Sequence, residues 1–169
     1  MLAFIALGSN LGDSQANVLC AMDRLKSLSD DPILKSSLWK STPVDCPPNS
    51  PEFINAVIGI VPRPAETPET LLAKLQALER KFGRRPKKVL NEPRPLDLDL
   101  IAFGNETRAG KVLTLPHPRA HQRDFVLQPL GEILPDLILP GQKRTVLQLL
   151  GELPPAAGPG SGKQPVRLE

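Results

Sequence analysis

This 169-residue chain is poor in aromatic residues and cysteine, and it contains no long hydrophobic run. No apolar stretch approaches the roughly 18 residues that a membrane-spanning helix needs, so none is predicted. The first residues, Met1 to Leu7, lack the basic start of a signal peptide and are instead typical of a strand. Cys20 and Cys46 do not have metal-site spacing, so we expect free thiols in a cytoplasmic protein.

Length and composition predict one globular domain. Apolar residues make up 40% of the chain, and 169 residues are enough to bury a sizeable core. The net charge of +3 is too small to indicate nucleic acid binding by itself. Residues 154–169 are rich in Gly, Pro and Ser, so we predict a domain over 1–153 followed by a disordered tail. A monomer is the default expectation.

The most informative segment follows a basic loop in the middle of the chain. Leu96, Leu98 and Leu100 alternate with Asp97 and Asp99, which is the period of a half-buried β-strand. The leucines can face a core while both carboxylates leave the opposite face, roughly 7 Å apart. Two such charges repel unless a cation lies between them, and oxygen-only ligands favour Mg²⁺ over Zn²⁺. The alternative is an edge strand with two exposed aspartates.

Basic residues flank this acidic pair on both sides. Seven of the fifteen residues from 80 to 94 are basic: Arg80, Lys81, Arg84, Arg85, Lys87, Lys88 and Arg94. A second group, Arg119, Arg123 and two histidines, follows the pair. Cations on both sides of a metal-binding acidic pair suit a polyphosphate ligand. For any one of these residues, a solvated basic face is the alternative.

The order of elements predicts an α+β protein with a ferredoxin-like βαββαβ sandwich. The predicted elements are strand 2–8, helix 13–28, strand 33–40, strand 53–61, helix 67–82 and strand 95–103. We expect an antiparallel sheet with two helices on one face and the other face open. C-terminal additions are a short strand near 111–115, a turn at 116–118 and helices near 126–133 and 145–151. Loops 42–52 and 84–94 are expected to wall a cleft on the open face.

Several separate motifs match one enzyme family in order and at matching spacings. They are Ala6–Gly12, Ser41–Pro43, Phe53–Ala56, Gln76 and Glu79 ahead of Phe82–Arg84, Pro93–Leu100, and Leu115–Pro118 with Arg123 and Phe125. Through them the chain resembles the 6-hydroxymethyl-7,8-dihydropterin pyrophosphokinases over roughly residues 2–150. The resemblance implies a folate-pathway transferase that moves pyrophosphate from ATP to a pterin alcohol and releases AMP.

The resemblance also implies roles for individual residues. Asp97 and Asp99 are expected to hold two Mg²⁺ ions that bridge the ATP phosphates, and with Arg84 and Arg94 they form the expected catalytic set. Contacts to the nucleotide are expected from Gln76, Glu79, Arg84, Arg94, His117 and Arg123, and from backbone near Leu100 and Thr114. The pterin pocket is expected to be lined by Thr42, Pro43, Phe53, Asn55 and Phe125, with the two phenylalanines sandwiching the ring.

Physical chemistry supports these residue types. A pterin is flat and aromatic, and stacking on an aromatic side chain contributes about 1–3 kcal/mol per ring in comparable nucleic-acid sites. The amide of Asn55 offers a donor and an acceptor together, which fits the lactam-and-amino edge of a pterin. Phe53 and Asn55 are two apart on a predicted strand and therefore share a face. Without the resemblance, both are also compatible with ordinary strand positions.

The chain departs from the family pattern in the basic loop. Asn91 stands where the family often carries a tryptophan, and Pro86 stands where it carries an arginine. Lys87 and Lys88 are the candidates to replace that arginine as point charges, without its bidentate fork. These departures bear on contacts of the closed loop, and loop 84–94 is still expected to open for ATP entry.

Two rival functions are compatible with the predicted fold. A ferredoxin-like nucleic-acid-binding module would use the basic loop and an open sheet, but two aspartates on that face would repel phosphates without a metal. A non-catalytic small-molecule-binding domain is the second rival, and intact Asp97 and Asp99 argue against it. The partners expected from the preferred hypothesis are ATP and the pterin alcohol, with no nucleic acid and no membrane.

Overall fold

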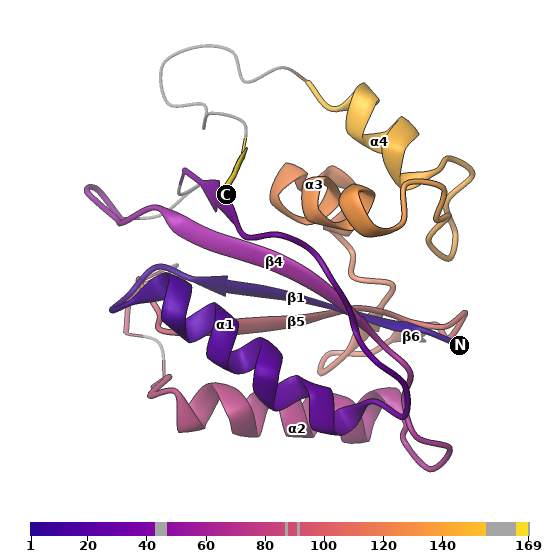
Figure 1. Ribbon diagram of the computed structural model, residues 1–169, viewed down its shortest axis with the longest axis horizontal. Coiled ribbons are helices and arrows are strands. Elements are labelled where there is room, and N and C mark those ends of the chain that lie inside the picture. The colour runs from indigo at the N-terminus through magenta and orange to yellow at the C-terminus, as the bar shows by residue number, and fades with distance from the viewer. Residues whose placement is uncertain (43–46, 87, 91, 155–164, 169) are drawn as a thin grey trace.

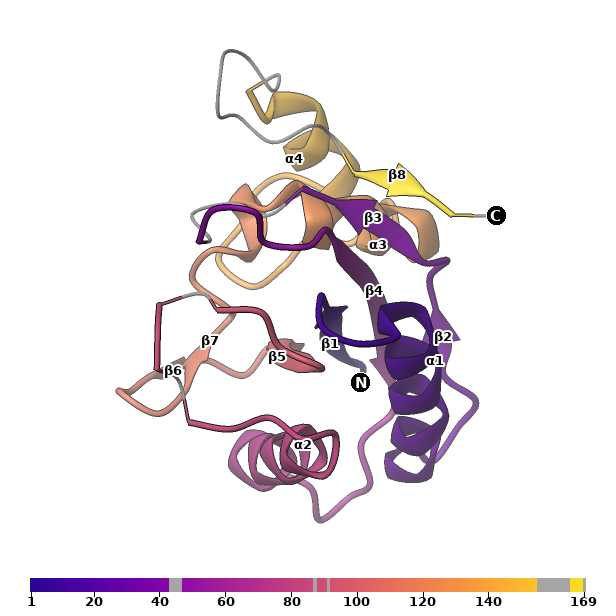
Figure 2. The same ribbon diagram turned by 90° about the vertical axis from the view of Figure 1, so that its left-hand side faces the viewer.

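An antiparallel sheet forms the centre of the molecule and helices pack on both of its faces (Figures 1 and 2). The computed structural model describes residues 1–42, 47–86, 88–90, 92–154 and 165–168. Its elements are β1 Ala3–Ser9, α1 Ser14–Leu25, η1 Lys26–Leu28, β2 Leu34–Lys35, β3 Trp39–Ser41, β4 Phe53–Ile60, α2 Pro68–Lys81, β5 Asp97–Phe103, β6 Arg108–Ala109, β7 Thr114–Leu115, η2 Ala120–Gln122, α3 Asp124–Ile133, α4 Val146–Glu152 and β8 Val166–Arg167. The predicted α+β class is confirmed.

The sheet places the strands that carry the acidic and aromatic motifs on either side of β1. The strand order is β5-β1-β4-β3-β8, and β2 also pairs with β4. All of these pairs are antiparallel. In the register of the three central strands, Ala6 of β1 lies opposite Val57 of β4 and Asp99 of β5. Side chains two residues apart on each strand therefore collect on one face, which includes Asp97, Asp99 and Asn55.

The first face of the sheet packs against α1 and α2. The alternating leucines of β5 and the buried side chains of both helices share one apolar cluster there. Helix α2 begins as its sequence predicts, because the Thr67 hydroxyl accepts a hydrogen bond from the Thr70 N–H at 3.1 Å and Pro68 occupies the first turn. It ends before Gly83, whose φ of +94° is a conformation that other residues rarely adopt.

The second face is partly covered, and the prediction of an open face is wrong in this respect. Helices α3 and α4 pack over it and form a second apolar cluster with Phe4, Val57 and Ile101. Figure 2 shows these helices on the side of the sheet opposite α1 and α2. The uncovered part lies beyond the start of α3, where Asp97, Asp99 and Asn55 line a cavity.

Two predicted strands differ from the structure. The expected strand 33–40 is divided into β2 and β3, because the buried Ser36 interrupts the ladder. Its hydroxyl accepts from the Val57 N–H at 3.0 Å and its own N–H donates to the Val57 carbonyl at 3.0 Å. The short strand expected near 111–115 is one half of a hairpin, in which β6 pairs with β7.

The C-terminal segment also differs from its prediction. The sequence predicts disorder throughout 154–169, but Val166–Arg167 form β8, which pairs with Trp39 and Lys40 of β3. The Leu168 N–H donates to the Leu38 carbonyl at 2.8 Å. The prediction is therefore wrong for these residues, while 155–164 and 169 lie outside the described residues. Within the described ranges, no helix is long and apolar enough to cross a membrane.

Candidate active site

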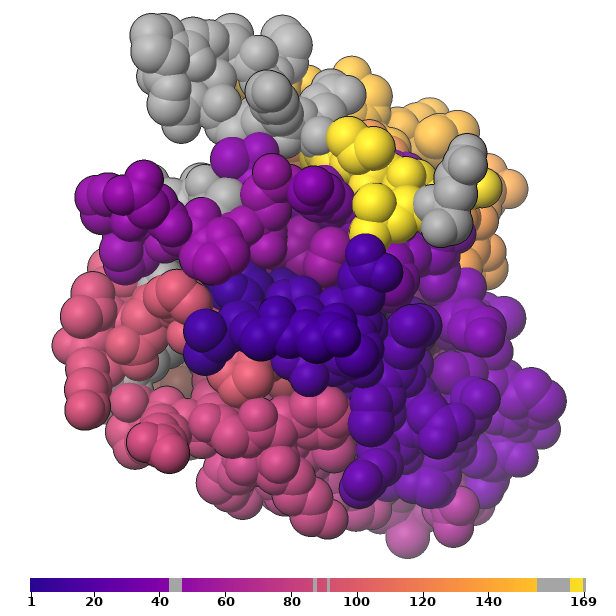
Figure 3. Space-filling view, turned by 60° about the vertical axis from the view of Figure 1, so that its left-hand side comes forward, coloured from indigo at the N-terminus to yellow at the C-terminus, as the bar shows by residue number. Residues whose placement is uncertain are grey.

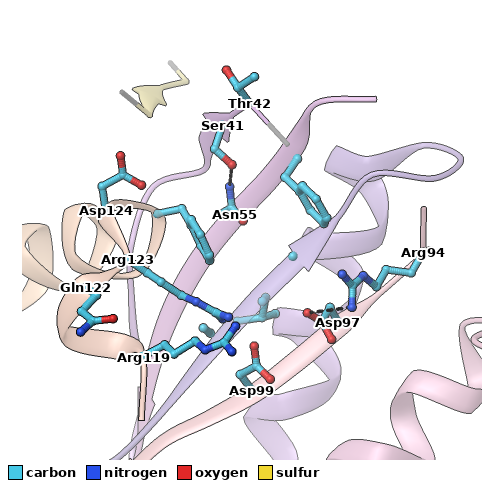
Figure 4. Close-up of a pocket in the computed structure, with 15 residues that line it drawn as sticks. Ser41, Thr42, Asn55, Arg94, Asp97, Asp99, Arg119, Gln122, Arg123 and Asp124 are labelled. Carbon is cyan, nitrogen blue, oxygen red and sulfur yellow. Dashed lines mark hydrogen bonds and ion pairs between the residues drawn. The ribbon is translucent and has the colours of Figure 1, made fainter. Parts of the chain in front are cut away.

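A cavity of about 300 Å³ opens where β1, β4 and β5 meet the start of α3 (Figure 4). Eight residues predicted from the sequence line it: Thr42, Phe53, Asn55, Arg94, Asp97, Asp99, Arg123 and Phe125. They come from separate parts of the chain. The strand residues meet because β4 and β5 both flank β1 in the sheet, and Arg123 and Phe125 join them from the start of α3. Gly8 forms part of the floor, and a β-carbon there would be in van der Waals contact with Asn55 Oδ1 at 3.5 Å.

One half of the cavity is lined by the two phenylalanines and an amide. Phe53 and Asn55 leave the same face of β4, and Phe125 enters from the first turn of α3. The buried Asn55 is fixed by a hydrogen bond in which its Nδ2 donates to Ser41 Oγ at 2.6 Å. Two aromatic rings and one oriented amide are the groups that a flat heterocycle with a polar edge requires.

The other half of the cavity holds the acidic pair. Asp97 and Asp99 project from β5 on the face opposite its leucines. Burial, followed by the nearby Asp97 carboxylate, raises the pKa of Asp99 to about 7. The sheet therefore holds two carboxyl groups close enough that ionising both is costly in the absence of a cation.

Arginines surround this pair. Arg84 donates to both Asp97 and Glu79, and Arg94 Nη1 lies 3.7 Å from Asp97 Oδ2. Burial raises the pKa of Glu79, which also accepts a hydrogen bond from the Leu98 N–H at 2.8 Å. Within the described part of the chain, Arg94 Nε is a buried donor without a hydrogen-bond partner.

The segment before α3 supplies further positive charge. Figure 4 shows Arg119 and Arg123 pointing toward Asp99 from the side opposite Arg94. Arg123 also lies over the Phe125 ring, with its guanidinium carbon 5.4 Å from the ring centre. Burial, followed by the charges of Arg123 and Arg119, lowers the pKa of His117 to about 4. The histidine is therefore neutral near pH 7, and its Nδ1 accepts a hydrogen bond from the Arg119 N–H at 3.2 Å.

Residues 4–135 match the family described as 7,8-dihydro-6-hydroxymethylpterin-pyrophosphokinase (HPPK). Among the relatives, the Haemophilus influenzae 2-amino-4-hydroxy-6-hydroxymethyldihydropteridine pyrophosphokinase is 39% identical over 142 residues, which cover 83% of this chain and 86% of the relative. The enzymes of the same name from Synechocystis and Pseudomonas aeruginosa are both 36% identical, and the matches cover 89% of this chain and 75% and 91% of those relatives. The chain belongs to this family. The predicted class, a pyrophosphokinase of folate biosynthesis, is therefore confirmed.

Solved structures of HPPK-DHPS proteins have a similar fold. One determined in complex with substrates gives a TM-score of 0.71 at 12% identity, over 89% of this chain and 42% of that chain. The wild-type Plasmodium falciparum HPPK-DHPS with pteroate gives a TM-score of 0.69 at 12% identity, over 89% of this chain and 44% of that chain. The chain thus spans less than half the length of these proteins, and the likeness shows the fold alone.

Several cavity residues are absent from the sequence-based site prediction. They are Ser41, Arg119, Gln122 and Asp124 on the walls and Ala6, Leu7 and Gly8 on the floor. The sequence identifies Arg119 only as part of a basic group, because nothing in the local pattern tells which way a loop residue points. Ser41 and Gly8 belong to the matched motifs, so membership of those motifs is the signal from which their place in the site could have been predicted.

Other predicted residues lie away from this cavity. Gln76 is exposed on α2, and Thr114 is exposed on β7. The Leu100 side chain is in the core beneath α1 and α2, so only its backbone remains available for the predicted contact. Roles for these residues in nucleotide binding stay predictions. Pro43, Lys87 and Asn91 lie outside the described residues.

The donor set at the acidic pair fits a hard divalent cation. Both candidate ligands are carboxylates, and no ion pair among the described residues involves Asp99. The described residues contain no group of three or more His, Cys, Asp or Glu side chains that could hold a metal alone. Two carboxylates completed by substrate oxygens and water are a usual Mg²⁺ arrangement in phosphate-transfer sites. Without a cation, Arg84 and Arg94 balance the charge of the Asp97 carboxylate.

Proposed function

We propose that this chain transfers the pyrophosphoryl group of ATP to the hydroxymethyl oxygen of 6-hydroxymethyl-7,8-dihydropterin and releases AMP. The observation that carries the proposal is the convergence in one cavity of an aromatic, amide-bearing half and an acidic, arginine-flanked half. The first half matches the chemistry of a pterin and the second matches that of a metal-bound polyphosphate. Membership of the family supports the same reaction.

The two halves suggest distinct roles for their residues. Phe53 and Phe125 would stack on the pterin ring while Asn55 and Thr42 would bond its polar edge. Arg84, Arg94 and Arg123 would bind phosphate oxygens, and the partnerless Arg94 Nε is a donor suited to one of them. His117, neutral because its pKa lies near 4, would donate a hydrogen bond to phosphate rather than act as a general base.

The reaction requires little covalent chemistry from the protein. The hydroxymethyl oxygen forms a bond to the β-phosphorus of ATP, the bond from that phosphorus to the α,β-bridging oxygen breaks, and the hydroxyl proton is released. Divalent cations at Asp97 and Asp99 would neutralise charge on the phosphates. The chain's own contribution is to hold the two substrates in line and to surround the phosphates with fixed arginines.

Several finer features also belong to this proposal. The sheet order and connectivity favour a ferredoxin-like sandwich with C-terminal additions. Two Mg²⁺ ions, rather than one, held by Asp97 and Asp99 would offset more of the negative charge of the carboxylates and the phosphates. A monomeric state and a cytoplasmic location stay predictions.

The proposal is tested by incubating the protein with ATP, Mg²⁺ and the pterin alcohol and separating the nucleotides. AMP should accumulate in step with the pterin diphosphate, and ADP should not. Asp97→Asn should lower kcat by at least about 100-fold, because it removes a carboxylate that acts on the transferred group. A circular dichroism melt should confirm that the variant is folded. Accumulation of ADP, or near-wild-type turnover by folded Asp97→Asn, would contradict the assignment.

A further inference from the structure

Asn10 is a buried polar residue that the roles described so far leave unused. It follows β1 and is only 1% exposed. Its side-chain Oδ1 accepts a hydrogen bond from the Arg94 N–H at 2.9 Å, and its Nδ2 donates to the Pro51 carbonyl at 3.3 Å. Its own N–H donates to the Arg94 carbonyl at 3.1 Å. One amide thus joins the segment that enters β4 to the segment that enters β5.

The two ends of this link belong to different halves of the cavity. Pro51 lies two residues before Phe53, in the aromatic half. Arg94 reaches Asp97 in the acidic half, with its Nη1 3.7 Å from the carboxylate. In Figure 3 the indigo N-terminal segment lies between the purple segment near β4 and the rose segment near β5. Asn10 therefore joins the Arg94 backbone to the segment that leads into Phe53.

A second contact joins Arg94 directly to the aromatic half of the cavity. The Arg94 guanidinium carbon lies 5.8 Å from the centre of the Phe53 ring, within the range of a cation–π interaction. The backbone of Arg94 is fixed by Asn10, so the direction of its guanidinium toward both Phe53 and Asp97 depends on that asparagine. A buried amide whose donor and acceptor are both used holds its partners in one geometry, and losing either bond leaves a peptide group unpaired.

Building on the proposed function, we propose that Asn10 is a positioning residue that couples nucleotide binding to pterin binding. Phosphates and metal at the acidic half fix Arg94 and Asp97 in one arrangement. Asn10 carries that arrangement to residues 51–53 and so orders the aromatic half for the pterin. Because binding free energies are linked, the pterin strengthens nucleotide binding by the same factor.

The coupling is measured from the Kd of the pterin alcohol with and without Mg²⁺ and a non-hydrolysable ATP analogue. In the wild-type protein the nucleotide should tighten pterin binding by about 10-fold or more. Asn10→Asp keeps an acceptor for the Arg94 N–H but sets a carboxylate oxygen against the Pro51 carbonyl. In this variant the coupling factor should fall below about 3-fold, while nucleotide binding alone changes less. Asn10→Ala should lose coupling to a similar extent.

Asn17 provides the matched control. Its Nδ2 donates to the Pro95 carbonyl at 3.1 Å and to the Leu11 carbonyl at 3.2 Å, so its hydrogen bonds hold the same segment and do not involve residues 51–53. Asn17→Ala should weaken nucleotide binding or lower the melting temperature and still keep the wild-type coupling factor. Equal loss of coupling in the Asn17 and Asn10 variants would overturn the proposal, because Asn10 would then act only through general stability.

A measurement on the wild-type protein covers the case in which the Asn10 variants do not fold. Hydrogen exchange at the amides of residues 52 and 53 should slow when Mg²⁺ and the nucleotide analogue are added without pterin. Unchanged exchange there, or a wild-type coupling factor of one, would overturn the role of Asn10. Formation of AMP by the wild-type protein tests the proposed function separately, so the two failures are distinguishable.

Discussion

At the scale of single residues, arginine dominates the charged contacts of the cavity. Arg84 Nη1 donates to two carboxylates at once, those of Glu79 and Asp97. Arg94 and Arg123 each lie over a phenylalanine ring as well as near the acidic pair. The side chains of Arg94 and Arg123 therefore connect the acidic half of the cavity with its aromatic half.

Arg119 should bind phosphate in place of the family arginine that Pro86 replaces. It lines the cavity, points toward Asp99 and forms no ion pair with any described residue (Figure 4). A hydrogen bond to a charged group contributes about 1.5–3 kcal/mol, so Arg119→Gln should raise the KM for ATP by about 10-fold or more. The KM for the pterin should change less than that for ATP, and Arg119→Lys should recover part of the loss.

The control for this prediction is Arg80→Gln, which removes an equal charge from the exposed surface of α2. If both glutamine variants raise the KM for ATP equally, the effect belongs to net charge and not to Arg119. Raising the salt concentration should reduce the difference between wild type and Arg119→Gln, since screening weakens an interaction between partly exposed charges.

Strand periodicity explains why part of the site was predictable. Because side chains alternate between the two faces of a strand, Asp97 must share a face with Asp99, and Phe53 must share a face with Asn55. In the structure each pair lines the cavity. Arg119 and Asp124 enter the cavity from the turn before α3 and the first helical turn, where no repeating pattern specifies direction. Their location depends on how α3 packs across the second face, which is a property of the tertiary structure.

At the scale of elements, the C-terminal strand β8 closes the exposed edge of β3. Arg167 of β8 pairs with Glu132 of α3, and Glu132 also accepts hydrogen bonds from Ser37 and Trp39. Leu168 packs against the first apolar cluster. Three elements that are distant in the sequence are thereby joined next to Ser41, which holds Asn55 in the cavity.

Removing residues 165–169 should therefore destabilise the domain. Loss of a short strand pairing and one apolar contact is worth about 1–2 kcal/mol, which corresponds to about 2–8 °C in melting temperature for a protein of this size. Leu168→Ala should reproduce part of this loss, whereas Val166→Ala, at a side chain that is 61% exposed, should have little effect. Differential scanning calorimetry measures all three, and an unchanged melting temperature after truncation would show that β8 contributes nothing.

The helices were more predictable than these edge pairings. Helix α2 has a capping threonine, a proline in its first turn and a glycine after its last turn, and these local signals specify both ends. The division of strand 33–40 depends instead on the Ser36 hydroxyl meeting Val57, and β8 depends on β3, more than 120 positions away. Pairings of this kind depend on the tertiary structure of the sheet and have no local sequence signal.

At the scale of the whole molecule, the sheet separates two apolar clusters and carries Asp97 and Asp99 on its second face, while His117 lies in the segment after β7. Two of the groups with shifted pKa values, Asp99 and His117, should change the stability of the metal-free protein with pH in opposite directions. The pKa of Asp99 is raised to about 7, so the folded state binds more protons than the unfolded state between about pH 4 and 7, and stability falls as pH rises. The pKa of His117 is lowered to about 4, so stability rises with pH between about 4 and 6.5.

The Asp99→Asn variant separates these two contributions to stability, because it removes the contribution of Asp99 and leaves that of His117. In EDTA at pH 8, the melting temperature of the variant should be higher than that of the wild type. This difference in melting temperature should narrow toward zero as the pH is lowered to about 4. Added Mg²⁺ should raise the melting temperature of the wild type at pH 8, because it neutralises the acidic pair, and should do so much less for the variant. If the difference in melting temperature does not change with pH, the cost of ionising Asp99 does not cause the difference in stability between the variant and the wild type.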